Sequence, residues 1–478
     1  MQIINIQESD YSFLVTITSE LIENLELKDI PCNVALPNEI TGKITLQFFL
    51  TKEQYKQSDI SKVWKFSANG ERKEIGLTYQ KIIADKIAFL KIKQFYDDLF
   101  VIDGKPTTLY LENHFSPLYE PIEPIVEFQL TPSRLLKPLR SVTDEDKYLW
   151  QASIKLSDGN TIVFDDKEYK YQDEKGSLIT TNSLIARCES LESGNQEDVQ
   201  KVSDLLDDIL LITSFAEGQT CLSLGWNTYD RQMERLYFRR DKVIPPPLED
   251  FWLNELIEPE DSFAAFLQTA YENFCSSKFQ PNIRRAINCL LNKRETVESQ
   301  FMSLYAGLES LVLGFRKTDG LEFVFSTEDE WNDFKAEFEK WVKNDSKLKN
   351  DSKRRCLIYE NVIGLQRRSF GNIFKSMLKF YNIDNEVNDL WNITGEKDGW
   401  SISKIRNKLV HGVAFVEPKK HRHLEIAMEN LRWTLNRLLL AILGWDVEKS
   451  NVSKTKLASK TAYKNWLESK KYLSLSTG

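Results

Sequence analysis

Hydrophobic and polar residues alternate with a period of two along roughly the first 180 residues of the chain. Segments such as Tyr11–Thr18 and residues 44–50 place β-branched and aromatic side chains at every second position, the pattern of strands with one buried face. Further segments of this kind occupy residues 87–93, 107–111, 125–130, 149–155 and 161–164. We therefore predict an antiparallel sandwich or barrel-like sheet.

The spacing of apolar residues becomes helical at residues 199–217, where Gly218 supplies a stop. A strand-like ribbon over residues 220–240 follows. The run Pro245-Pro246-Pro247 fits neither a helix interior nor a central strand and predicts a stiff, extended spacer. We place a domain boundary at this run.

Helical periodicity dominates the remainder of the chain. The predicted helices cover residues 261–277, 281–316, 327–342, 352–363, 370–380, 401–410 and 421–443. Thr327 and Glu330 form a capping-box pattern at one of these starts. The fold class is thus α+β: a β-rich N-terminal domain (1–248) with one helical segment near 199–217, an all-α bundle (249–447) and a basic C-terminal tail (448–478).

Composition narrows the class of protein. The 478 residues suffice for two or three domains, and 41% hydrophobic residues can form cores. Six scattered cysteines without a C-x-x-C pair fit a reducing compartment. The N-terminus lacks a secretory signal, and the apolar run 438–445 is shorter than the roughly 20 residues that cross a bilayer. We expect a cytoplasmic protein without membrane attachment.

Charge is distributed unevenly along a chain whose net charge is −8. Residues 347–380 contain nine Lys or Arg against the two acids Asp351 and Glu360. A run of this kind is either a solvated helical face or a surface that binds a polyanion. The cations of the run that we assign to the second role are Lys353, Arg354, Arg355, Arg367 and Arg368.

The chain has four histidines, and one of them stands in a distinctive pattern. The four are His114, His411, His421 and His423. Three have no nucleophile or metal-ligand neighbours at a suitable spacing. His411 lies five residues after Arg406, directly before Gly412. Cationic side chains near a helix C-terminus interact favourably with the helix dipole, and glycine commonly ends a helix. The alternative interpretation of this segment is therefore a helix end with a purely structural role.

The segment Arg406-Asn407-Lys408-Leu409-Val410-His411 resembles the signature of HEPN-domain ribonucleases, in which a polar residue follows the Arg and a His comes four to six residues later. Residues 301–312, where Glu309 interrupts an apolar stripe, resemble an early helix of that domain. The resemblance is closest to the Apea-like HEPN group of bacterial antiphage proteins and covers roughly residues 282–445.

This resemblance implies an endoribonuclease effector of antiphage or abortive-infection defence that needs no metal or other cofactor. Arg406, His411 and Asn407 would be catalytic, Glu309 would be a buried partner that orients Arg406, and Lys408 would join the cations named above in binding RNA. The expected substrate is structured RNA such as tRNA. The HEPN bundle would form a homodimer or higher even oligomer, and the N-terminal domain would sense a phage-derived trigger.

The chemistry of the pair agrees with such an activity. A histidine with a pKa near 6.5 exchanges protons at neutral pH, and arginine neutralises phosphate charge through its bidentate fork. On one helix, however, five residues turn through about 500°, so the two side chains point about 140° apart. One chain would supply an incomplete site, which two protomers could complete.

The sequence argues against several other classes of function. The chain lacks a phosphate-binding glycine loop, which argues against ATP hydrolysis and hydride transfer, and it lacks the clustered ligands of a metal-dependent hydrolase. The alternative that remains is a catalytically silent HEPN module that binds nucleic acid or nucleotide. An intact Arg/His pair argues against that alternative.

Overall fold

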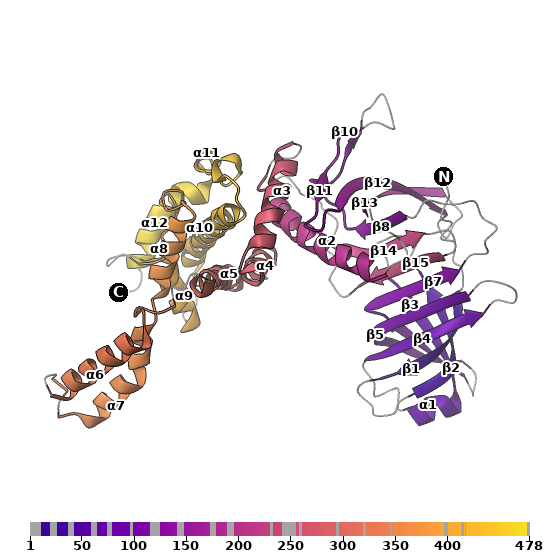
Figure 1. The fold of residues 1–478 in the computed structure, drawn as a ribbon, viewed down its shortest axis with the longest axis horizontal. Coiled ribbons are helices and arrows are strands. Elements are labelled where there is room, and N and C mark those ends of the chain that lie inside the picture. The colour runs from indigo at the N-terminus through magenta and orange to yellow at the C-terminus, as the bar shows by residue number, and fades with distance from the viewer. Residues whose placement is uncertain are drawn as a thin grey trace. The chain divides into compact units, whose positions relative to one another are not determined.

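A computed structural model describes residues 11–475 except 20–25, 37–42, 59–64, 74–78, 96–98, 115–124, 141–147, 173–177, 189–195, 230–232, 241–254, 258–260, 293–295, 319–321, 345–346, 349, 396–399, 413–414 and 416. The chain divides into two compact units (Figure 1). The first comprises residues 1–254 and 259–268, and the second comprises residues 255–258 and 269–478. The proline run and the predicted boundary at residue 248 lie outside the described residues.

The first unit begins with an antiparallel β-barrel. Its strands are β1 (Tyr11–Thr18), β2 (Glu26–Ala35), β3 (Thr45–Thr51), β4 (Lys65–Lys73), β5 (Tyr79–Phe95) and β6 (Leu99–Lys105). They are ordered β5-β4-β1-β2-β3-β6, and pairing of β6 with β5 closes the ring. Helix α1 (Lys52–Ser58) follows β3. Alternate side chains point inward, as Leu46, Phe48 and Leu50 do on β3, and form the apolar core that the period-two pattern predicted.

The same sheet continues beyond the barrel because the long strand β5 also pairs with β7. The additional strands are β7 (Thr108–His114), β8 (Ile125–Leu130), β11 (Ser153–Lys155), β12 (Thr161–Gln172), β13 (Leu178–Cys188), β14 (Ser223–Tyr229) and β15 (Met233–Arg239). Their order is β7-β15-β14-β8-β13-β12-β11. Strands β9 (Leu139–Arg140) and β10 (Tyr148–Trp150) form a separate two-stranded sheet.

Helix α2 (Gln196–Glu217) packs on this extension of the sheet near β14 (Figure 1). Its apolar side buries Val202, Leu206 and Ile209, and Asp207 forms an ion pair with Arg239 of β15 at 2.8 Å. Gly218 follows with a φ of 70°, which confirms the predicted stop. The first unit is therefore a barrel and a sheet that share β5, with α2 packed on the sheet.

The second unit is helical. Its helices are α3 (Asp261–Ser276, whose first eight residues belong to the first unit), α4 (Gln280–Leu291), α5 (Val297–Thr318), α6 (Glu328–Asn344), α7 (Ser352–Asn361), α8 (Phe370–Phe380), α9 (Ile402–Val410), α10 (Pro418–Ile442), α11 (Lys454–Leu457) and α12 (Thr461–Leu475). The 3-10 helices η3 (Val362–Gln366) and η4 (Val447–Lys449) follow α7 and α10. Helix α5 packs against α4, α8, α9 and α10, and α12 packs against α10. The molecule thus combines an N-terminal antiparallel barrel with later helices.

Two predictions for this helical part were wrong. The single helix expected over residues 281–316 is two helices, because the Thr296 hydroxyl accepts a hydrogen bond from the Ser299 N–H at 3.2 Å and begins α5 anew. The segment from residue 448, expected as a peripheral tail, packs against the unit, because Leu457 and Leu473 are buried. Across the described residues, helices long and apolar enough to cross a bilayer do not occur.

Candidate functional site

Helix α9 carries the Arg/His pattern and is anchored by its apolar side. Ser401 caps its start by accepting a hydrogen bond from the Lys404 N–H, and Ile402 and Ile405 are buried. The helix contains no acid, whereas Lys404, Arg406 and Lys408 lie along it. A short helix of this composition presents positive charge to solvent, which suits an anionic ligand.

Arg406 is held by three neighbouring side chains. Its Nη2 lies 3.2 Å from Glu309 Oε1 on α5, and its Nη1 donates to Asn407 Oδ1 at 3.2 Å. The guanidinium carbon lies 5.6 Å from the centre of the Tyr305 ring, a cation–π distance. The structure therefore brings together Arg406, Asn407 and Glu309 from the residues singled out in the sequence, and adds Tyr305.

Glu309 differs from the sequence expectation in one respect. We expected a buried carboxylate, but its side chain is 42% exposed, and that of Arg406 is 31% exposed. Glu309 lies on α5 between Leu308 and Ser310, which are buried, and its carboxylate reaches out to Arg406 at the surface. An ion pair this open orients the guanidinium but contributes little to folding stability, typically below about 1 kcal/mol.

Tyr305 was not recognised from the sequence. Its ring is buried, and its hydroxyl lies 2.9 Å from Ser403 Oγ, which in turn donates to the Ile393 carbonyl at 2.7 Å. Burial raises the pKa of the Tyr305 phenol. The available signal was its spacing: Tyr305 precedes Glu309 by four residues and therefore shares its face of α5.

His411 ends the helix and is exposed. It occupies the C-cap position, where its N–H donates to the Asn407 carbonyl at 3.1 Å, and Gly412 follows with a φ of 79°. Arg406 contacts Glu309 of α5, whereas His411 is exposed. Five positions along a helix correspond to about 140° beyond one full turn, so the two side chains are not expected on one face of α9.

The cations predicted to bind RNA lie elsewhere in the helical unit. Lys353, Arg354 and Arg355 are on α7, which packs against α6 and η3, whereas α9 packs against α5. Arg354 pairs with Asp351 at 3.4 Å, and Arg355 donates to the Leu348 carbonyl at 3.1 Å.

Arg367 and Arg368 follow η3 directly. Phe323 and Arg367 form an isolated antiparallel bridge, and Arg368 Nε donates to the Phe323 carbonyl at 2.9 Å. Of the predicted RNA-binding cations, only Lys408 shares α9 with Arg406.

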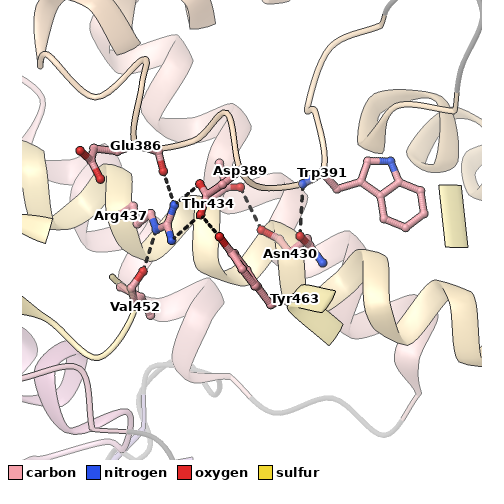
Figure 2. Close-up of polar contacts among 8 residues, drawn as sticks. All are labelled: Glu386, Asp389, Trp391, Asn430, Thr434, Arg437, Val452 and Tyr463. Carbon is pink, nitrogen blue, oxygen red and sulfur yellow. Dashed lines mark hydrogen bonds and ion pairs between the residues drawn. The ribbon is translucent and has the colours of Figure 1, made fainter. Parts of the chain in front are cut away.

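A second polar cluster in this unit surrounds a buried arginine and has a structural role. Figure 2 shows Arg437 of α10 enclosed by Asp389, the carbonyls of Glu386 and Val452, and Tyr463 of α12. The Arg437 side chain is 0% exposed. Tyr463 donates to Asp389 Oδ2 at 2.6 Å, and burial together with Asp389 raises the pKa of its phenol to about 12. The Arg437 guanidinium, which has no access to solvent, thus joins α10 to Asp389, to the Glu386 carbonyl and to the Val452 carbonyl.

No family model, curated protein or solved structure matches the chain. In the part of the chain that the structure describes, groups of three or more His, Cys, Asp or Glu placed to hold a metal ion do not occur. The protein thus has a β unit that contains a barrel, followed by a helical unit. In the helical unit, the cationic helix α9 carries an oriented arginine and ends at an exposed histidine.

Proposed function

We propose that this protein is a HEPN-type endoribonuclease that cleaves structured RNA such as tRNA without a metal ion. The observation that carries the proposal is the setting of Arg406, which Glu309 and Tyr305 orient at the surface of an acid-free helix that ends in the exposed His411. A guanidinium can neutralise a phosphate, and an imidazole can act as a general acid or base.

In the proposed reaction the 2′-oxygen of a ribose attacks the adjacent phosphorus while the bond from phosphorus to the 5′-oxygen breaks. His411 takes the 2′-hydroxyl proton while water protonates the departing 5′-oxygen, or His411 protonates the 5′-oxygen while water takes the 2′-hydroxyl proton; Arg406 stabilises the charge that develops on the phosphoryl oxygens. The products are a 2′,3′-cyclic phosphate and a 5′-hydroxyl. A second protomer would bring the complementary Arg and His to one cleft, because a single α9 directs them apart.

The HEPN assignment, the role in antiphage defence and the sensing role of the N-terminal unit rest on the resemblance of residues 282–445 described above. Within that proposal Asn407 fixes the Arg406 guanidinium, and Lys408 on the same helix contacts neighbouring phosphates. Phosphate contacts of this kind make binding weaken steeply as salt rises.

The test is cleavage of total tRNA by the purified full chain in EDTA, comparing the parent with Arg406→Ala and His411→Ala. We expect both substitutions to reduce cleavage at least about 100-fold, the usual contribution of one acid–base group. Arg432→Ala is a matched control, because Arg432 is also 31% exposed and lies 3.8 Å from a glutamate, Glu429. His421→Ala, on another partly exposed histidine, controls for the loss of an imidazole.

Cleavage unaffected by Arg406→Ala and His411→Ala would eliminate this site. The contacts of Arg406 also fit a second candidate function, a catalytically silent binding module. Glu309, Asn407 and Tyr305 all belong to the same chain as Arg406, so these contacts can serve the fold of one protomer without any reaction. If neither the parent nor any variant cleaves RNA, filter binding of the same proteins to tRNA distinguishes the nuclease from the silent module. Salt-sensitive binding that His411→Ala leaves intact would favour the silent module.

A further inference from the structure

Residues 322–368 form a helical arm that projects from the rest of the helical unit (Figure 1). At its base, the Val324 N–H donates to the Gln366 carbonyl at 2.8 Å, and the Arg368 N–H donates to the Glu322 carbonyl at 3.2 Å. These bonds join the segment after α5 to the segment before α8, so both ends of the arm are fixed. The arm itself consists of α6, α7 and η3.

The arm has very little core of its own. None of the ten residues of α7 is buried, and α6 buries only Trp331 and Val342. Aromatic rings run along one side of α6, where Trp331, Phe334, Phe338 and Trp341 follow one another at centroid distances of 5.9, 6.0 and 6.1 Å. Because most helices gain their stability from packing of an apolar face, two helices with so little burial leave much of that stability unrealised.

Large apolar side chains are concentrated on the surface of this arm. Of the thirteen large hydrophobic residues exposed in the described part of the chain, seven lie between residues 323 and 365. The most exposed of them are Trp341 at 53%, Leu357 at 59% and Ile363 at 57%. Such a concentration marks an interaction surface rather than the scattered apolar residues of an ordinary exterior.

Charge indicates what covers the surface. Helix α6 carries six acids and three lysines, whereas α7 carries Lys353, Arg354 and Arg355 with the single acid Glu360. A two-fold arrangement of two arms would place the acidic α6 of each beside the basic α7 of the other, with the apolar side chains between them. Helices of opposite charge would then alternate around a four-helix bundle. The acids of α6 would repel RNA phosphates, so a nucleic acid fits this surface less well.

We infer that the arm is a homotypic docking element, and that its partner is the arm of a second copy of this chain. The inference is independent of the proposed nuclease activity, since it uses none of the residues around Arg406. It assigns the α7 cations Lys353, Arg354 and Arg355 to protein–protein contact in place of the RNA contact expected from the sequence.

Two full-length charge-reversal proteins test the inference. One carries Asp333→Lys and Glu337→Lys on α6, and the other carries Lys353→Glu and Arg354→Glu on α7; all four positions are exposed. Sedimentation velocity over a concentration series should show a dimeric parent and association of each variant weakened at least about tenfold by like-charge contact. An equimolar mixture of the two variants should restore the dimer, because all helix pairs across that interface again have opposite charge.

A second comparison guards against misfolding. Leu357→Gln should weaken association, whereas Leu90→Gln, at a barrel position with a similar 55% exposure, should leave it unchanged. A parent that stays monomeric at the highest soluble concentration overturns the inference, as do reversal variants that dimerise as well as the parent. A mixture that fails to form heterodimers overturns it too. Unchanged dimers with weakened tRNA binding in the α7 variant would instead assign the α7 cations to RNA.

Discussion

Among the ion pairs that the structure describes in the helical unit, Arg437 has the most completely buried charge, and its removal should be costly. Arg437→Met would leave the carboxylate of Asp389, which is 13% exposed, without its cation. Breaking a buried pair in this way costs about 3–5 kcal/mol. We expect a loss of that size in urea unfolding followed by tryptophan fluorescence. Removing both charges, in Arg437→Met with Asp389→Leu, should cost less, and Arg432→Met at a partly exposed pair should cost under about 1 kcal/mol.

His423 provides a pH dependence at the contact between α10 and α12. Its Nδ1 lies 3.0 Å from Ser469 Oγ, and its ring lies 4.2 Å from that of Tyr472. Burial, and secondarily Arg422, lowers the pKa of His423 below its usual 6.5, while Glu468 opposes the shift. The folded state therefore favours the neutral ring, and the stability it contributes is present above about pH 6.5 and lost as the pH falls below that value.

Protection factors of the α12 amides, obtained from hydrogen exchange between pH 7.5 and 5 after correction for the intrinsic exchange rate, should accordingly fall further in the parent than in His423→Gln. NMR titration should give His423 a pKa lower than that of a histidine in a peptide. A parent and variant with the same pH dependence would show that other groups control this contact.

At the scale of single elements, the end of α9 depends on one glycine. Gly412 has a φ of 79°, and a Cβ added there would meet no atom within 4 Å, so substitution changes backbone strain alone. Gly412→Ala should cost about 1–2 kcal/mol and loosen the last turn, raising amide exchange at Val410 and His411. Gly412→Asn should be milder, because asparagine tolerates this conformation.

Gly364→Ala serves as the control, since Gly364 is equally open but lacks a positive φ. If the nuclease proposal holds, tRNA cleavage should fall with Gly412→Ala and recover with Gly412→Asn. Equal exchange in all three variants would show that the helix end is fixed by other contacts.

Elements with strong local signals were predictable from the sequence. Strands β1 and β8 and helix α8 have the predicted bounds, and Thr327 caps α6 by accepting a hydrogen bond from the Glu330 N–H at 3.2 Å. The missed strands include β2, which contains Pro31, and β4, which is largely polar. Their place in the barrel comes from pairing with β1 and not from their own pattern.

At the scale of the whole molecule, the sequence predicted β-rich and helical parts in the right order, but it could not predict which strands pair. Closure of the barrel through β5 and β6 depends on contacts that periodicity does not encode. The site shows the same limit. The Arg406–Glu309 contact was expected from the resemblance of residues 301–312 to a HEPN helix, whereas the packing of Tyr305 against Arg406 required the approach of α5 and α9.

The strand order has a consequence for synthesis on the ribosome. The barrel strands are complete once residue 105 has emerged, but β7, which ends at His114, pairs on its second side with β15, which ends at Arg239. At the usual translation rate of about 5–20 residues per second, that edge of β7 stays unpaired in the nascent chain for roughly 10 seconds. During this interval the open edge of β7 can pair with a strand of another nascent chain on the same polysome. Slow translation between β7 and β15 would therefore favour aggregation, and a ribosome-bound chaperone would protect the chain most by binding this edge.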